Sequence, residues 1–210
     1  MPGATALLRN EPVQARSTAR LTSLLDAAAE VVDEIGFERL TTAMVAERAG
    51  ASIGTVYRYF PDRIAVLQSL AARSLAQFVQ RIRPSLTEPV RENWWEAVST
   101  VFDDAVNAFR SVPGFRSLRF GDVIDVHPAT DDRSGNSIMS GEIASVLAST
   151  YGLPDDDELR VRVEVAVTIA DSLLARAFAT NRKGEPRYID EARAVVRSYL
   201  VGHYGEPAGA

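Results

Sequence analysis

The chain has 210 residues, which is enough for one large domain or two modest ones. Hydrophobic residues make up 46% and charged residues 24%, so a globular core can form. The net charge of -5 excludes a protein that coats nucleic acid through bulk positive charge, although it allows a small basic patch. The absence of cysteine excludes disulfides, thiolate zinc sites and iron–sulfur clusters, and with only two histidines we expect no metal site and no cofactor.

The N-terminal residues show no sign of a membrane or export segment. No apolar run approaches the length of a membrane span, and the start lacks the basic-then-apolar order of a signal peptide. We therefore expect a soluble cytoplasmic protein with no membrane partner. Residues 1–16 show no hydrophobic period, which predicts a flexible N-terminal arm. Arg9, Arg16 and Arg20 could enter a DNA minor groove, although a disordered tail without contacts is the simpler interpretation.

The next part of the chain predicts four helices, at residues 17–35, 42–49, 52–59 and 62–83. The first has apolar residues at three- and four-residue steps, and Gly36 follows it as a left-handed cap. Thr41 or Thr42 can cap the second helix and Ser52 the third, because their side chains accept hydrogen bonds from the free N–H groups of a first turn. Pro84 is expected to end the fourth.

The remainder predicts five more helices, at residues 90–111, 115–121, 136–150, 156–182 and 187–203. Between Leu159 and Ile169 apolar and polar residues alternate, which taken alone is typical of a half-buried strand. A helix is favoured because residues 155–183 contain no glycine or proline over a length unusual for a strand. No second strand is available to pair with it. The predicted fold is therefore all-α.

The second and third helices have the pattern of a helix-turn-helix motif, in which the second helix of the pair enters the DNA major groove. Gly50, between them, fits a turn position that needs a positive φ. The helix that enters the groove must expose slim side chains so that its backbone can approach base edges. Ser52, Gly54 and Thr55 meet this demand.

Side chains able to bind phosphate lie on the same helix and just beyond it. Tyr57 and Tyr59 carry hydroxyls that can donate to phosphates, and Arg58 and Arg63 can add charge-assisted contacts. Residues 48–63 contain three arginines and one acid, which gives a local charge of +2 on a mildly acidic domain. This suits sequence-specific binding better than non-specific coating.

Residues 24–67, LLDAAAEVVDEIGFERLTTAMVAERAGASIGTVYRYFPDRIAVL, resemble the N-terminal domain of the tetracycline-repressor (TetR) family of transcriptional regulators. The run AGASIGTVYRYF, residues 49–60, is similar to the family's recognition-helix signature. The resemblance implies a three-helix, helix-turn-helix DNA-binding domain at residues 17–66. It also implies a helical ligand-binding and dimerisation domain at residues 67–210.

The residues and the resemblance together indicate the DNA contacts. The candidates are Thr41, Thr42, Ser52, Ile53, Gly54, Thr55, Tyr57, Arg58, Tyr59 and Arg63. Arg63 stands where the family usually has lysine, and its guanidinium keeps the charge that a phosphate contact needs. Ala43 stands where many members have a polar or basic residue, which puts a contact there in doubt. Ile53 stands where polar side chains often read bases, so it either touches a thymine methyl group or packs.

In the family, the C-terminal region holds a pocket for a small inducer. The candidates for lining it are Trp95, Phe102, Phe115 and Phe120, although ordinary core packing explains the same aromatic residues equally well. The resemblance also implies a homodimer formed through the last two helices, about residues 156–182 and 187–203.

These observations predict a ligand-responsive transcriptional regulator, most simply a repressor, that binds a palindromic DNA operator as a dimer and is released by a small-molecule inducer. The alternative is a helical dimeric protein whose C-terminal pocket belongs to an enzyme or a scaffold. No nucleophile–base pairing, metal-ligand spacing or phosphate loop supports catalysis, so we expect no catalytic residues.

Overall fold

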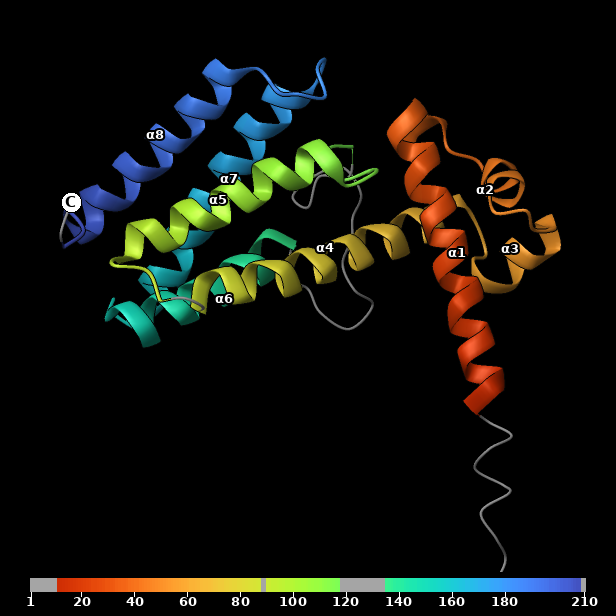
Figure 1. Cartoon of the computed structure of the whole chain (residues 1–210), viewed down its shortest axis with the longest axis horizontal. Helices are drawn as coiled ribbons and strands as arrows, with labels where there is room; N and C mark the ends of the chain where they lie inside the picture. Colours follow the sequence, from red (N-terminus) through yellow and green to blue (C-terminus); the bar gives the residue numbers. More distant parts are fainter. Residues whose placement is uncertain (1–10, 88–89, 118–134, 209–210) are drawn as a thin grey trace, which may run out of the picture. The chain divides into compact units, whose positions relative to one another are not determined.

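The computed structural model describes residues 11–87, 90–117 and 135–208, and these residues are all-helical, as predicted (Figure 1). The chain divides into two compact units, Met1–Leu70 and Ala71–Ala210. No helix in the described ranges combines the length and the apolar character needed to cross a bilayer.

The first unit contains α1 (Glu11–Ile35), the short 3-10 helix η1 (Phe37–Arg39), α2 (Thr42–Arg48), α3 (Ile53–Tyr59) and the first turns of α4 (Arg63–Thr87). Helix α1 lies beside α2 and η1, and α2 lies beside α3 (Figure 1). The buried apolar side chains of this unit include Leu24, Leu25, Val32, Leu40, Val45, Val56, Phe60 and Leu67. Burial of each contributes about 1.5–3 kcal/mol, which holds the short helices in place.

Helix α1 begins at Glu11, earlier than the predicted start at Ser17, so residues 11–16, expected in the arm, are helical. Pro12 is compatible with this start because the first turn of a helix does not need the N–H that proline lacks. Residues 1–10, including Arg9, lie outside the described residues. Arg16 and Arg20 therefore lie on a helix and not in a flexible arm.

Pro84 lies inside α4, so the prediction that it ends this helix is wrong. Proline within a helix costs about 3 kcal/mol, because it removes a hydrogen bond and its ring clashes with the preceding turn. Ile82 and Leu86, on either side of it, are buried in the core of the second unit. Their burial offsets the cost and carries α4 on to Thr87.

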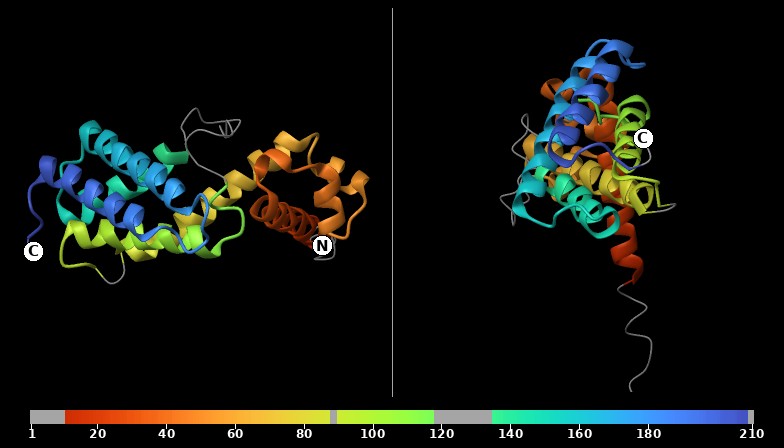
Figure 2. Two further views of the ribbon diagram at one scale, coloured as in Figure 1. Left: turned by 90° about the horizontal axis from the view of Figure 1, so that it is seen from above. Right: turned by 90° about the vertical axis from the view of Figure 1, so that its left-hand side faces the viewer.

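The second unit contains the rest of α4 together with α5 (Trp94–Ser111), α6 (Gly135–Tyr151), α7 (Asp157–Phe178) and α8 (Pro186–Tyr204). Helices α7 and α8 run alongside each other, and α6 packs against α7 (Figure 2). The predicted helix at 115–121 is not present in the described part of that segment, because residues 113–117 form turns. Gly114, with φ of 77°, directs the chain out of the helical region after Pro113.

The strand-like alternation in α7 has a helical explanation. Leu159, Val163 and Ala166 are buried in the core, whereas Val161 and Val165 are exposed on the opposite side of the same helix. Apolar residues on both faces of a helix produce the alternation without any strand. The prediction of a helix is confirmed, and α7 has a second apolar face that no described residue covers.

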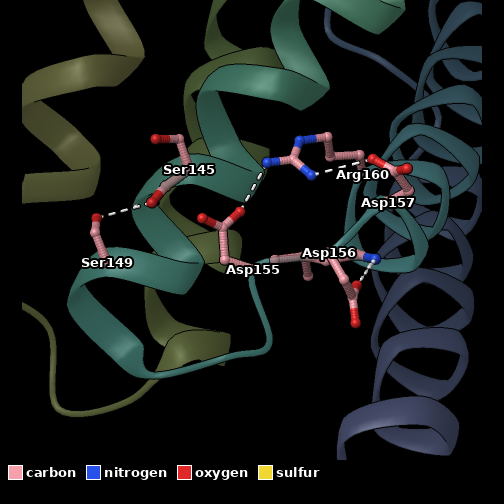
Figure 3. Close-up of polar contacts among 7 residues, drawn as sticks. Ser145, Ser149, Asp155, Asp156, Asp157 and Arg160 are labelled. Carbon is pink, nitrogen blue, oxygen red and sulfur yellow. Dashed lines mark hydrogen bonds and ion pairs between the residues drawn. The ribbon is translucent and has the colours of Figure 1, made fainter.

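The start of α7 is fixed by a group of polar contacts (Figure 3). The Asp156 carboxylate accepts a hydrogen bond from the Leu159 backbone N–H at 2.8 Å and caps the helix. Arg160 donates to Asp155 at 2.7 Å and to Asp157 at 3.3 Å. Acidic side chains in a first turn also interact favourably with the helix dipole, so these contacts define where α7 begins.

Candidate DNA-binding surface and ligand cavity

Helices α2 and α3 form the helix-turn-helix that the sequence predicts. The Thr41 hydroxyl caps α2 by accepting from the Met44 N–H at 3.2 Å, and the Ser52 hydroxyl caps α3 by accepting from the Thr55 N–H at 3.1 Å. Between them Gly50 has φ of 56°, a left-handed conformation that strains other residues. Residues within the motif itself therefore supply both helix caps and the turn.

One side of α3 holds the helix to the unit, and the opposite side is open. Val56 is fully buried and Phe60, just after the helix, is also buried. The exposed side carries Ser52, Ile53, Gly54, Tyr57 and Arg58. Ile53 is 43% exposed and Tyr57 54% exposed, so neither serves as a core residue within the described chain. The alternative that Ile53 simply packs is thereby disfavoured.

The remaining candidates lie at the edges of this open side. The Thr42 hydroxyl donates to the Tyr57 hydroxyl at 3.4 Å, which links the start of α2 to the end of α3. Thr55 is half-buried, and its hydroxyl lies 2.9 Å from that of Ser52. Tyr59, also half-buried, has its hydroxyl 3.3 Å from the Ser17 hydroxyl on α1. Sequence reasoning missed Ser17 as a partner of Tyr59, because 42 positions separate the two residues.

The three arginines of the basic stretch have different surroundings. Arg48 forms a bidentate pair with Glu34, at 2.9 and 2.7 Å, and a further contact with Glu30 at 3.2 Å. Arg63 donates to the Glu38 backbone carbonyl at 2.6 Å. Arg58 is exposed and forms no ion pair with a described residue. The local charge counted from sequence therefore overstates the free positive charge, since acids of α1 balance Arg48.

The ion pair between Arg48 and Glu34 also shifts the pKa values of both groups. Hydrogen bonds from the Arg48 guanidinium hold the pKa of the Glu34 carboxyl below its ordinary value of 4.5, against a smaller opposing effect of burial. The same contacts raise the pKa of Arg48, so it is charged at any physiological pH. The pair joins α2 to α1 and contributes to the shape of the first unit, not to the open face of α3.

The second unit contains a partly open apolar cavity of about 80 Å³ between α4, α5, α6, α7 and α8. Two of the candidates for ligand contacts, Phe102 and Phe115, line it. Trp95 does not line it; its ring packs near the Arg197 guanidinium, 5.9 Å away. Phe120 lies outside the described residues.

The cavity wall also contains side chains that sequence reasoning missed. They include Phe78, Phe109, Met139 and Asp171, the last being the one charged side chain among the described lining residues. Phe115 lies 5.3 Å from Phe78 and 5.4 Å from Phe109, ring centre to ring centre. Four helices and a turn contribute these residues, so sequence spacing alone does not bring them together. Within residues 11–87, 90–117 and 135–208, no three His, Asp or Glu side chains are grouped to hold a metal ion.

Comparison with known proteins agrees with this arrangement. The sequence model described as "Bacterial regulatory proteins, tetR family" matches residues 24–70. The model described as "Tetracyclin repressor-like, C-terminal domain" matches residues 92–204, more than half of the chain. The chain belongs to the tetR family. Its predicted membership is confirmed, and the comparisons give no support to the alternative of a helical enzyme.

Individual relatives extend the match across most of this tetR-family chain. The HTH-type transcriptional repressor KstR of Rhodococcus jostii is 31% identical over 165 residues, which are 76% of this chain and 72% of that protein. The Fatty acid metabolism regulator protein of Bacillus subtilis is 34% identical over 65 residues, only 34% of its own length. A crystal structure of a TetR-family regulator from Streptomyces coelicolor has 35% identity and a TM-score of 0.73, and covers 90% of this chain and 99% of its own. The protein is a transcriptional regulator of the tetR family with an N-terminal helix-turn-helix and a helical C-terminal domain.

Proposed function

We propose that the protein is a cytoplasmic repressor that binds a palindromic DNA operator as a homodimer and leaves it when a small apolar inducer enters the second unit. The observation that carries the proposal is the open face of α3, where small and polar side chains surround an exposed Ile53 and Tyr57. A face of this kind can approach base edges, whereas a core-facing helix cannot.

The residues of the open face divide into two groups by chemistry. Ser52, Gly54 and Thr55 let the α3 backbone approach the groove, and the Ile53 side chain is suited to contact a thymine methyl group. Tyr57 and Arg58 reach outward and are suited to phosphate. Thr41, Thr42, Tyr59 and Arg63 lie at the edge of the face and complete the candidate phosphate contacts. Arg63 has donors left beyond its hydrogen bond to the Glu38 carbonyl. The Thr42 and Tyr59 hydroxyls donate their single protons to Tyr57 and to the Ser17 carbonyl, so they must redirect these protons to bind phosphate.

The dimer is proposed to form through α7 and α8. Val161 and Val165 on α7 and Val195 on α8 are exposed, on helices that pack against each other. Burying such a face against its copy would form a four-helix bundle. A two-fold dimer would present two α3 helices about 34–36 Å apart, one turn of DNA, or at a longer helically phased spacing.

The inducer is proposed to occupy the cavity lined by Phe102 and Phe115. Its volume of about 80 Å³ is well below the ~300–1,000 Å³ of pockets that hold drug-sized ligands. Full entry of a ligand of that size would therefore move the surrounding helices apart. A ligand that favours this expanded state over the compact one shifts the equilibrium between them, which is the requirement for coupling to DNA release.

The test is to select genomic DNA fragments on the purified protein and measure binding to the enriched sequence. Arg58→Ala and Tyr57→Ala should weaken binding. Arg58→Ala should also make the slope of log affinity against log salt shallower by about one unit, because one phosphate is no longer neutralised. Arg81→Ala, the same charge change at an exposed position of α4 in the second unit, is the control and should leave binding unchanged. Failure of the unmodified protein to enrich any sequence at low salt would overturn the proposal.

The inducer is tested on the same protein by a thermal-shift screen of small apolar compounds. A compound present at about 100 times its Kd should stabilise the protein by about 2.7 kcal/mol. It should also release the selected DNA. Ala105 lines the cavity, so the larger side chain of the Ala105→Leu variant fills part of it. This variant should lose the response to the compound and keep its DNA binding. A compound that stabilises the Ala105→Leu variant equally and still releases its DNA would contradict an inducer site here.

A further inference from the structure

The N-terminal turns of α1 extend beyond the core of the first unit. Residues 15–20 are all exposed, and full burial along the helix begins at Leu24. In Figure 1 this red end of α1 runs past α3. An isolated helical segment is only marginally stable in water, since most helices are stabilised by packing of one face. These exposed turns therefore present a helix face on which a partner can bind.

Among the described residues, this exposed part of α1 makes its side-chain contact with α3. The Tyr59 hydroxyl, at the end of α3, lies 3.3 Å from the Ser17 hydroxyl and donates to the Ser17 carbonyl at 3.4 Å. Tyr59 thereby joins the exposed part of α1 to the edge of the open face of α3. The two surfaces are continuous.

The side of α1 that is apolar in the core becomes basic toward the N-terminus. Leu24, Arg20 and Arg16 follow one another at four-residue steps, so they share one side of the helix, with Ser17 between the arginines. Leu24 is fully buried, whereas both arginines are exposed. In the described part of the chain neither arginine forms an ion pair. Two like charges at this spacing repel each other, which an anionic partner would relieve.

We propose that Arg16, Ser17 and Arg20 bind the sugar–phosphate backbone of duplex DNA beside the groove that α3 enters. The inference rests on the proposed operator binding, because it uses the continuity of this stripe with the α3 face. Arginine guanidinium groups match phosphate geometry and can bind it in a bidentate manner. Because these residues lie on α1 and not in an extended arm, they contact phosphates from outside and do not thread into the minor groove as a flexible arm does.

The test compares the full chain with the Arg16→Ala/Arg20→Ala double variant on the DNA selected by the unmodified protein. The slope of log affinity against log salt should become shallower by about one unit for each phosphate that the variant no longer neutralises. Affinity should fall by the same factor on a scrambled duplex of equal length, because phosphate contacts carry no sequence information. The Arg16→Lys/Arg20→Lys variant keeps the charges and should retain most of the slope. Arg81→Ala is again the control for charge.

The outcomes separate this inference from the proposed function. If the unmodified protein binds no DNA, the operator proposal itself fails. If it binds and the double alanine variant keeps the original slope, operator binding stands and the α1 inference is overturned. A changed slope together with an altered sequence preference would also contradict it, since the stripe would then be reading bases. Thermal unfolding should be unchanged in both variants, because the substituted side chains are exposed.

Discussion

At the scale of single residues, the DNA-binding motif depends on caps and on one glycine. The hydroxyls of Thr41 and Ser52 satisfy the first turns of α2 and α3, and each such cap contributes about 1 kcal/mol. Gly50 turns the chain between the helices at φ of 56°. These are short-range requirements, so a short segment of sequence can specify the turn that orients α3.

Two glycines with positive φ should differ in how they tolerate alanine. A Cβ added at Gly50 meets nothing within 4 Å, so Gly50→Ala should cost only the backbone strain, about 1 kcal/mol. A Cβ added at Gly184, φ 80°, would lie 2.6 Å from Phe178 Cζ and 2.8 Å from Ile189 Cδ1. Gly184→Ala should therefore destabilise by a further ~1–3 kcal/mol. Urea unfolding of both variants measures the difference, and equal destabilisation would contradict the steric explanation.

At the scale of secondary-structure elements, the short helices are held by contacts with their neighbours more than by their own length. Helix α2, Thr42–Arg48, is too short to be stable alone. Its own Val45 and Ala46 are buried against the rest of the unit, and Arg48 joins the end of α2 to Glu34 on α1. The position of α2, and of α3 that follows it, therefore depends on α1.

The Arg48–Glu34 link predicts a particular dependence of stability on pH. Because Arg48 lowers the pKa of Glu34 in the folded state, the contribution is complete above the ordinary value of 4.5 and is lost as the pH falls through the lowered pKa. Glu34→Gln should reduce stability modestly at pH 7, and the difference from the unmodified protein should vanish in acid. Both groups are solvent-accessible, so high salt should also diminish it. Chemical unfolding across pH checks this, and a difference that does not diminish as the pH falls below the ordinary carboxyl range would exclude the ion pair as its source.

At the scale of the whole molecule, the proposed regulation needs two copies of the chain and a way for the second unit to respond to a ligand. The second unit supplies an apolar cavity and, on α7 and α8, an exposed apolar face. The opposite sides of α7 serve these two purposes, since Val163 lines the cavity and Val165 lies on the exposed face. A movement of α7 caused by a ligand would therefore reach the proposed dimer interface directly.

The dimer proposal predicts that charges on this face separate the subunits. Val165→Glu/Val195→Glu should convert the protein to a monomer, because two carboxylates would be buried without partners at the interface. Operator affinity should fall sharply, since each α3 would then bind a half-site alone. Analytical ultracentrifugation measures the mass. Val90→Glu, at a valine 65% exposed outside α7 and α8, is the matched control and should leave the dimer intact. A dimeric double variant would show that another surface joins the subunits.

The sequence alone was sufficient for the all-α class and for the helix-turn-helix, because caps, the Gly50 turn and helical periodicity are encoded within a few neighbouring residues. It did not predict that α4 continues through Pro84, because burial of Ile82 and Leu86 in the core supplies the compensating free energy. Nor did it show that Arg48 is paired with Glu34 or that Tyr59 meets Ser17, since these partners are brought together only by packing. The cavity has the same origin: its wall comes from separate helices, and their arrangement in three dimensions determined that Phe102 faces it and Trp95 does not.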